Sequence, residues 1–145
     1  MKTIFTTLIL LLTTLFSAVS ASPSGVSVKN AWIAEAPPVS KVMVAYMSIE
    51  NNSEDDITIV KAESDSYSSI EFHETRYEDG MARMIRHDSL LIPANSHITL
   101  KRGGKHLMLF NPVKRLNAGD SVTINLITKN NVEKTIQVTV KKSQY

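Results

Sequence analysis

The sequence predicts an all-β domain, a sandwich or a barrel, on three observations. From Val26 onward apolar and polar residues alternate in short runs, and no segment keeps a helical apolar period for three turns. Turn-forming residues separate these runs at short intervals, as they do in sandwiches and barrels. The chain has 145 residues, which is the length of a single domain.

Nine strands follow in order, each bounded by a turn. The predicted ranges are 26–33, 42–50, 57–62, 69–74, 81–87, 97–101, 106–110, 121–127 and 133–140. The turns that divide them include Pro37-Pro38, Asn51-Asn52-Ser53, Glu78-Asp79-Gly80, Pro93-Ala94-Asn95, Gly103-Gly104, Asn117-Ala118-Gly119-Asp120 and Asn130-Asn131. The last two strands alternate most clearly, which predicts a core containing Val122, Ile124, Leu126, Ile136, Val138 and Val140.

The first 21 residues have the pattern of a secretory signal peptide. Lys2 gives a short positive start, Ile4 to Phe16 is an uncharged run, and Val19-Ser20-Ala21 supplies the small residues of a cleavage site. This run is shorter than the roughly 20 apolar residues that span a membrane. We therefore expect cleavage after Ala21, no transmembrane segment in the mature chain, and one domain at 22–145 that works outside the cytoplasm.

The composition excludes several function classes. Lys and Arg number 16 against 14 Asp and Glu, an excess too small for a nucleic-acid partner. The absence of cysteine excludes a disulfide scaffold, a thiolate metal site, a thiol nucleophile and a lipid-anchored cysteine. No glycine-rich phosphate loop and no Gly-x-Ser-x-Gly elbow is present, so an enzyme is not expected.

Histidine and methionine carry the chemical signal. His106-Leu107-Met108 places an imidazole and a thioether on the same face of a strand, where both can approach one ion. On residue grounds alone a strand methionine is more often core filler than a ligand. His73 and Met84 add weight, because ten residues separate them and 21 residues separate Met84 from His106.

This spacing, His-x10-Met-x21-His-x-Met, resembles the signature of the periplasmic PCu(A)C copper chaperone family. The resemblance extends from Val26 to Val140 and includes Phe72-His73-Glu74, Asp79-Gly80-Met81-Ala82-Arg83-Met84, Leu91-Ile92-Pro93-Ala94, Gly103-Gly104-Lys105-His106-Leu107-Met108-Leu109 and Leu116-Asn117-Ala118-Gly119-Asp120. It implies a cupredoxin-like Greek-key β-barrel or sandwich in the periplasm. It also implies a copper site made of His73, Met84, His106 and Met108.

The chemistry of this ligand set agrees with the resemblance. Thioether sulfur is soft and imidazole is borderline, so two Met and two His favour Cu(I) over Zn²⁺, Ca²⁺ or Mg²⁺. The resemblance further implies delivery of copper toward the copper centre of cytochrome c oxidase, with a thioredoxin-like copper chaperone as a further partner. We expect a monomer.

Two other hypotheses for the function remain open. Copper storage or resistance would use the same four residues, and a metal-independent adhesion or assembly module would use them for packing. The remaining candidates are assigned structural roles: Met81 lies on the face opposite Met84, Met43 and Met47 belong to the core with Trp32, and His87 and His97 are solvated. The acidic run Glu54-Asp55-Asp56 lacks the spacing of a calcium loop and is interpreted as a solvated turn.

Overall fold

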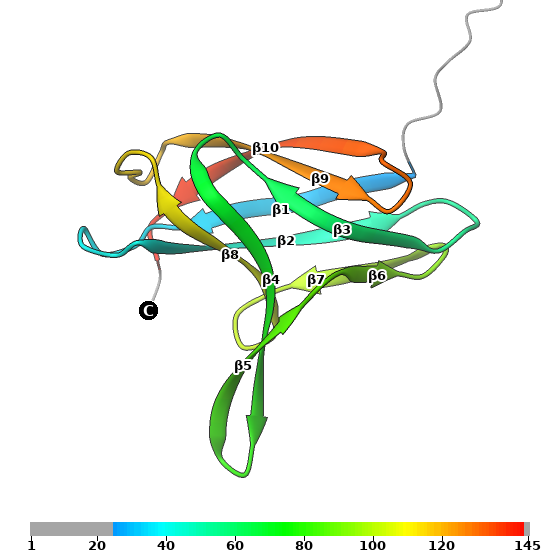
Figure 1. Cartoon of the computed structure of the whole chain (residues 1–145), viewed down its shortest axis with the longest axis horizontal. Coiled ribbons are helices and arrows are strands. Elements are labelled where there is room, and N and C mark those ends of the chain that lie inside the picture. The colour runs from blue at the N-terminus through cyan, green and yellow to red at the C-terminus, as the bar shows by residue number, and fades with distance from the viewer. Residues whose placement is uncertain (1–24, 144–145) are drawn as a thin grey trace, which may run out of the picture.

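Ten β-strands and no helix make up residues 25–143, the part of the chain described by this computed structural model (Figure 1). The strands are β1 (Val26–Ala34), β2 (Val42–Asn51), β3 (Ile57–Glu63), β4 (Tyr67–Glu78), β5 (Met81–His87), β6 (Leu90–Ile92), β7 (Ser96–Leu100), β8 (Lys105–Pro112), β9 (Ser121–Thr128) and β10 (Glu133–Lys141). The predicted signal peptide lies outside the described residues. Within those residues, no helix has the length and hydropathy to cross a membrane.

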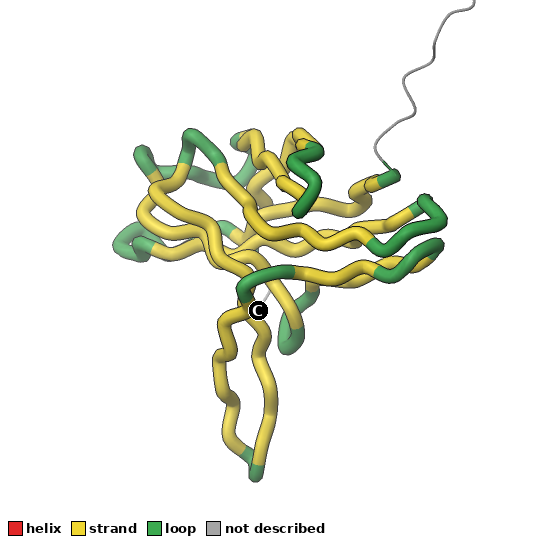
Figure 2. The backbone as a smooth tube through the Cα atoms, turned by 45° about the vertical axis from the view of Figure 1, so that its right-hand side comes forward, coloured by secondary structure: helices red, strands yellow, loops and turns green. Residues whose placement is uncertain are grey.

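The strands form one curled sheet in the order β5-β4-β8-β2-β1-β10-β9-β3-β6, and β7 pairs with β2. β1 and β10 run parallel, and the other paired strands run antiparallel. The sheet curls until β3 contacts β4 and β6 contacts β7, so that it encloses a single core (Figures 1 and 2). The predicted all-β, cupredoxin-like class is confirmed.

The core is built by strict alternation along the strands. Every second residue of β2 from Met43 to Ile49 is buried, and all six core residues predicted in β9 and β10 are buried. Full burial of one such side chain stabilises the fold by about 1.5–3 kcal/mol. Since the buried apolar residues lie between Val26 and Val140, the described domain contains its own core.

Trp32 departs from its predicted place in the core. The pairing of β1 with β2 shifts register between Lys29 and Trp32, and Asn30 takes a positive φ of 53° there. This bulge moves the alternation by one residue, so Ile33 points into the core instead of Trp32. The half-buried indole packs against Tyr46, with ring centroids 5.0 Å apart.

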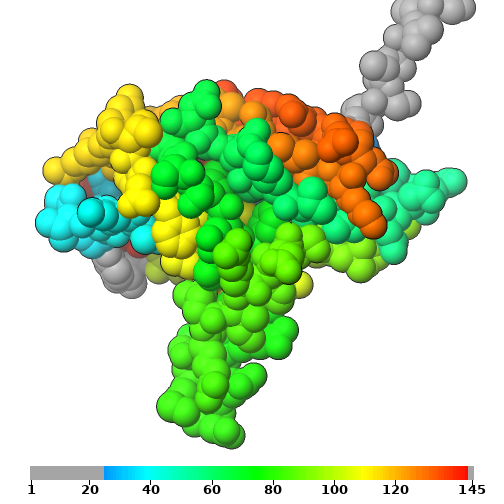
Figure 3. Space-filling view, viewed as in Figure 1, coloured from blue at the N-terminus to red at the C-terminus, as the bar shows by residue number. Residues whose placement is uncertain are grey.

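A hairpin arm, formed by the last residues of β4 and the first residues of β5, extends away from the barrel (Figures 1 and 3). β8 pairs with β4 only from Tyr67 to Glu74, so the ladder of the last four β4 residues is with β5 alone. Asp79 and Gly80 close the arm with φ angles of 51° and 77°, as a two-residue hairpin turn requires. The arm carries Met84 beyond the edge of the barrel.

β7 and β8 pair with the same edge of β2, one after the other. Leu100 of β7 is opposite Met47, and Leu107 of β8 is opposite Ala45. Six residues, Lys101 to His106, are therefore inserted opposite a single β2 residue, Tyr46. Gly103 turns this excursion with a φ of 71°, and bulges of this kind often lie beside functional sites.

Two strand predictions differ from the structure. The fold has ten strands rather than nine, because β6 is only three residues long and too short for its alternation to be recognised. β4 runs for 12 residues, where the prediction gave six, since the residues it adds at its ends, Tyr67-Ser68 and Thr75 to Glu78, show no apolar alternation.

Candidate functional site

His73 and His106 lie directly opposite each other on the adjacent strands β4 and β8. Their rings are stacked at an interplanar angle of 29°, with centroids 6.1 Å apart. Alternation places both on the outer face of the sheet, since Phe72 and Leu107, the residues beside them, point into the core. Two imidazoles in this arrangement can share one ion.

His106 is the most deeply placed of the predicted ligands, with 5% of its surface exposed. Its Nδ1–H donates to the carbonyl oxygen of Gly104 at 2.9 Å, so Nε2 is the nitrogen left for a ligand. Burial lowers the pKa of His106, and the neighbouring His73 lowers it further against the opposing hydrogen bond to Gly104. The environment therefore favours the neutral ring, which is the form that binds a metal.

His73 is held by a carboxylate rather than by the backbone. Its Nε2 lies 2.9 Å from Oε2 of Glu71, and Oε1 of Glu71 lies 3.5 Å from Nη1 of Arg86. The other ring nitrogen, Nδ1, is buried and has no hydrogen-bond partner within the described chain. A buried polar atom without a partner is uncommon in folded proteins and calls for a physical explanation.

Met108 follows His106 by two residues on the same face of β8. It is opposite Glu71 on one side and opposite Val44 of β2 on the other, and it is half-buried. Its sulfur therefore belongs to the ladder row next to the histidine pair.

Met84 lies on the hairpin arm and has 54% of its surface exposed. It is opposite Thr75, whose hydroxyl donates to the methionine sulfur at 3.7 Å. Thr75 and Glu71 lie two residues from His73 in opposite directions, so Met84 and Met108 flank the histidine pair from opposite sides. The structure thus places the four predicted ligands on one face without closing them into a cage.

The donor atoms fit a soft metal ion. Within residues 25–143 no three His, Asp or Glu side chains are placed to hold a metal together, and Met84 and Met108 lie on the same sheet face as the histidine pair. The unpartnered Nδ1 of His73 and the Nε2 of His106 offer nitrogen donors beside them. Two imidazoles with thioethers form a set suited to Cu(I).

The other His and Met residues occupy mostly the predicted places. Met43 and Met47 are buried in the core, Met81 lies on the face opposite Met84, and His97 is exposed. The prediction for His87 was wrong. Its ring is half-buried, and its Nε2 lies 2.8 Å from Oε2 of Glu74, because the β4–β5 ladder brings these side chains together on the core-side face.

Glu71, Arg86 and Gly104 are the site residues without a predicted role. The sequence placed Glu71 on the same face as His73, and that alternation was the available signal. Arg86 is brought to His73 by the hairpin register, and the carbonyl of Gly104 by the excursion before β8. Neither arrangement follows from local sequence pattern.

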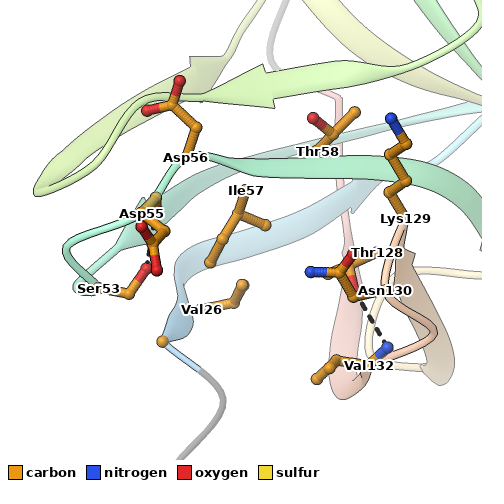
Figure 4. A pocket seen from close by; sticks show the side chains of 11 residues that line it. Val26, Ser53, Asp55, Asp56, Ile57, Thr58, Thr128, Lys129, Asn130 and Val132 are labelled. Carbon is orange, nitrogen blue, oxygen red and sulfur yellow. Dashed lines mark hydrogen bonds between the residues drawn. The ribbon is translucent and has the colours of Figure 1, made fainter.

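A separate hollow of about 260 Å³ lies between the start of β1, the β2–β3 turn and the β9–β10 turn, and contains none of these residues (Figure 4). Asp55 and Asp56 lie on one side of it and Lys129 on the other. Asp56 accepts a hydrogen bond from the backbone of Ala94 at 2.9 Å. Glu54, Asp55 and Asp56 are all exposed and lie outside the strands, in agreement with the interpretation of the acidic run as a solvated turn.

Comparison with known proteins places the chain in a family. The family described as "Putative lipoprotein LpqE-like" matches residues 26–140. RP573, an uncharacterised protein of Rickettsia prowazekii, is 32% identical over 96 residues, which are 66% of this chain and 53% of that protein. Lxx21020 of Leifsonia xyli, named as a lipoprotein, is 33% identical over 103 residues, which are 70% of this chain and 61% of that protein. The chain thus spans little more than half the length of these relatives.

Solved structures share the fold. The copper-bound PCuAC domain from PmoF2 superposes with a TM-score of 0.70 at 20% identity, over 82% of this chain and 94% of that domain. The solution structure titled CuI-DR1885, from Deinococcus radiodurans, gives a TM-score of 0.66 at 31% identity, over 88% of this chain and 84% of that protein. The resemblance to PCuAC domains is confirmed, and the chain belongs to the LpqE-like family.

Proposed function

We propose that this protein is a copper chaperone that binds Cu(I) through His73, Met84, His106 and Met108. The observation that carries the proposal is the stacked histidine pair with thioethers on the same sheet face, in which a buried imidazole nitrogen has no hydrogen-bond partner among residues 25–143. A metal ion would give that nitrogen a partner. The proposed work is binding and release, with no chemical turnover.

The ligand chemistry supports reversible carriage. All four donors are neutral when the histidines are deprotonated, and thioethers need no deprotonation. Methionine is also not lost to disulfide formation in an oxidising compartment, where cysteine ligands would be. The Deinococcus protein, which is 31% identical, is described with Cu(I) bound, and this likeness supports the same cargo here.

We place this work outside the cytoplasm, in the periplasm. The pattern of residues 1–21 and the lipoprotein name of the family both support an exported protein. The acceptor we propose is the copper centre of cytochrome c oxidase, reached directly or with a thioredoxin-like copper chaperone as a partner.

A competition titration tests the site. Residues 22–145 are titrated with Cu(I) against a chromophoric chelator under anaerobic, reducing conditions, beside Met84→Ala, Met108→Ala and the control His87→Ala. His87 is a suitable control because it bonds Glu74 on the other face of the same hairpin. One tight equivalent, weakened by both methionine changes and retained in His87→Ala, supports the proposal. Absence of a tight equivalent in the unaltered chain rejects it.

A genetic experiment separates delivery from storage. Deletion of the gene should lower cytochrome c oxidase activity, and added copper should restore it, if the protein delivers copper. Copper-sensitive growth with normal oxidase activity would instead assign the same site to protection.

A further inference from the structure

We propose that Glu71 is a positioning residue of the copper site, which selects the nitrogen of His73 that faces the metal. By this inference copper is bound through Nδ1 of His73 and through Nε2 of His106. It rests on the proposed function and adds to it a residue that is not a ligand and the identity of the two nitrogen donors.

The contact between Glu71 and His73 fixes the tautomer of the ring. Oε2 of Glu71 lies 2.9 Å from Nε2 of His73, and a carboxylate oxygen can only accept a hydrogen bond. Nε2 must therefore carry the hydrogen. In a neutral imidazole with the hydrogen on Nε2, the lone pair is on Nδ1.

Nδ1 of His73, in contrast, lacks a hydrogen-bond partner in the described part of the chain. It is buried, and no described residue makes a hydrogen bond to it. The His73 side chain as a whole is only 13% exposed. A buried lone pair that has no hydrogen-bond partner and lies beside a second imidazole is available to bind a soft cation.

Glu71 is itself held in place. Its second oxygen lies 3.5 Å from Arg86, which is directly opposite His73 on β5. One carboxylate oxygen thus serves each partner, and the ladder register brings all three side chains to the same face. This ion pair favours the carboxylate orientation in which the other oxygen faces the ring.

His106 is oriented by a different partner, which leaves the other ring nitrogen free. Its Nδ1–H donates to the carbonyl of Gly104 at 2.9 Å, which leaves Nε2 as the donor nitrogen. Histidine ligands typically donate their second N–H to a carboxylate or a backbone carbonyl, and this pair uses one of each. The two rings therefore present different nitrogens.

The same hairpin offers a matched control. Glu74 holds Nε2 of His87 at 2.8 Å, which is again a carboxylate oxygen on a ring nitrogen, but this contact joins β4 to β5 on the face that lacks the proposed ligands. Glu74→Ala should change the ring of His87 and leave both His73 and copper affinity unaltered.

Long-range ¹H–¹⁵N NMR of the histidine rings tests the inference on ¹⁵N-labelled residues 22–145. In the metal-free protein the lone-pair nitrogen of His73 should be Nδ1. In Glu71→Ala the ring should populate both tautomers, while Glu71→Gln, whose amide oxygen can still accept from Nε2–H, should preserve the wild-type form. A His73 ring that carries its hydrogen on Nδ1, or keeps one tautomer in Glu71→Ala, overturns the role of Glu71.

Addition of Cu(I), which is diamagnetic, then identifies the bound nitrogens. Nδ1 of His73 and Nε2 of His106 should shift, and Glu71→Ala should weaken Cu(I) affinity by about 10–100-fold. Binding through Nε2 of His73 would overturn this inference alone. If Cu(I) moves no histidine ring resonance, the proposed function itself fails, and the ligation inferred here fails with it.

Discussion

Leu107 shows how a β-strand divides folding from function at the level of single residues. It lies between His106 and Met108, yet it is fully buried and points to the opposite side of β8. Leu107→Ala should lower the free energy of unfolding by about 2–5 kcal/mol, because it removes core contacts and leaves a cavity. Denaturant unfolding measures this loss.

The same variant should bind Cu(I) almost as well as the unaltered protein under conditions in which it remains folded. The chelator competition used for the methionine variants checks this. A loss of affinity as large as that of Met108→Ala would show that the outer face depends on core packing more than strand alternation implies.

Met108 and Met43 are a matched pair on opposite faces. Met108→Leu keeps the side-chain volume but removes a proposed donor, so Cu(I) affinity should fall by at least about tenfold, equivalent to about 1.4 kcal/mol. Met43→Leu, in the core, should keep the affinity and cost about 1–3 kcal/mol of stability, because it also removes the sulfur that accepts from the Tyr67 hydroxyl. Competition titration and denaturant unfolding of both variants test the pair, and equal affinities would remove Met108 from the site.

At this scale the sequence predicted which residues are candidates but not how they are oriented. Alternation put His73 and His106 on the outer face, and ligand spacing selected Met84 over Met81. The choice of ring nitrogen depends on Glu71 and on the carbonyl of Gly104, and therefore on strand register and a backbone turn. Such contacts are tertiary, so no local pattern contains them.

The hairpin arm is the element that we expect to respond to copper. The ladder of its last residues is only between β4 and β5, and Met84 contributes an exposed sulfur. Ligation of Met84 would fix the arm relative to β8. Hydrogen exchange of the arm amides should therefore slow on addition of Cu(I), as local opening becomes less favourable.

Met84→Ala provides the control for that prediction. The arm should then exchange at the metal-free rate even with Cu(I) bound elsewhere in the site. Exchange measured by mass spectrometry or NMR gives both rates. An unaltered rate in the wild-type protein would indicate that copper is held without the arm.

The length of the arm was not predictable from residue patterns. Thr75 to Glu78 are polar or exposed on both faces, and a strand without a buried face has no periodicity to detect. The Asp79-Gly80 turn was visible because it depends on local backbone preference. The sequence thus marked the tip of the arm but not its extent.

Alkaline stability of the whole domain should depend on Tyr67. Burial raises the pKa of Tyr67 to about 12, and its hydroxyl donates to the sulfur of Met43 at 3.3 Å. The unfolded chain has the ordinary tyrosine pKa of about 10, so above that pH it loses this proton before the folded protein does. The free energy of unfolding should therefore fall between pH 10 and 12, by an amount on the order of 2 kcal/mol.

Comparison with Tyr67→Phe isolates this contribution. The variant should lose the part of the pH dependence that comes from Tyr67, while every other contribution is the same in both proteins. Urea unfolding at several pH values above 9 measures the difference. Parallel curves would mean that the Tyr67 hydroxyl titrates normally in the folded domain.

The fold class of the whole molecule followed from alternation and turns, because these are local properties that a curled antiparallel sheet repeats. The exceptions have identifiable causes. A bulge in β1 puts Ile33 into the core in place of Trp32. The pairing of β7 and β8 with successive parts of the same β2 edge creates the excursion that ends at His106. Both are breaks in ladder register, which depend on the partner strand as well as on the strand itself.

The unequal exposure of the proposed ligands would give the proposed copper transfer a direction. His106 and His73 are shielded by the barrel, whereas more than half of the Met84 surface faces solvent. An incoming donor from an acceptor protein would meet the metal on the Met84 side and displace that thioether first, while the imidazoles still hold the ion. Copper would thus pass through a shared intermediate and would not be released free into solution.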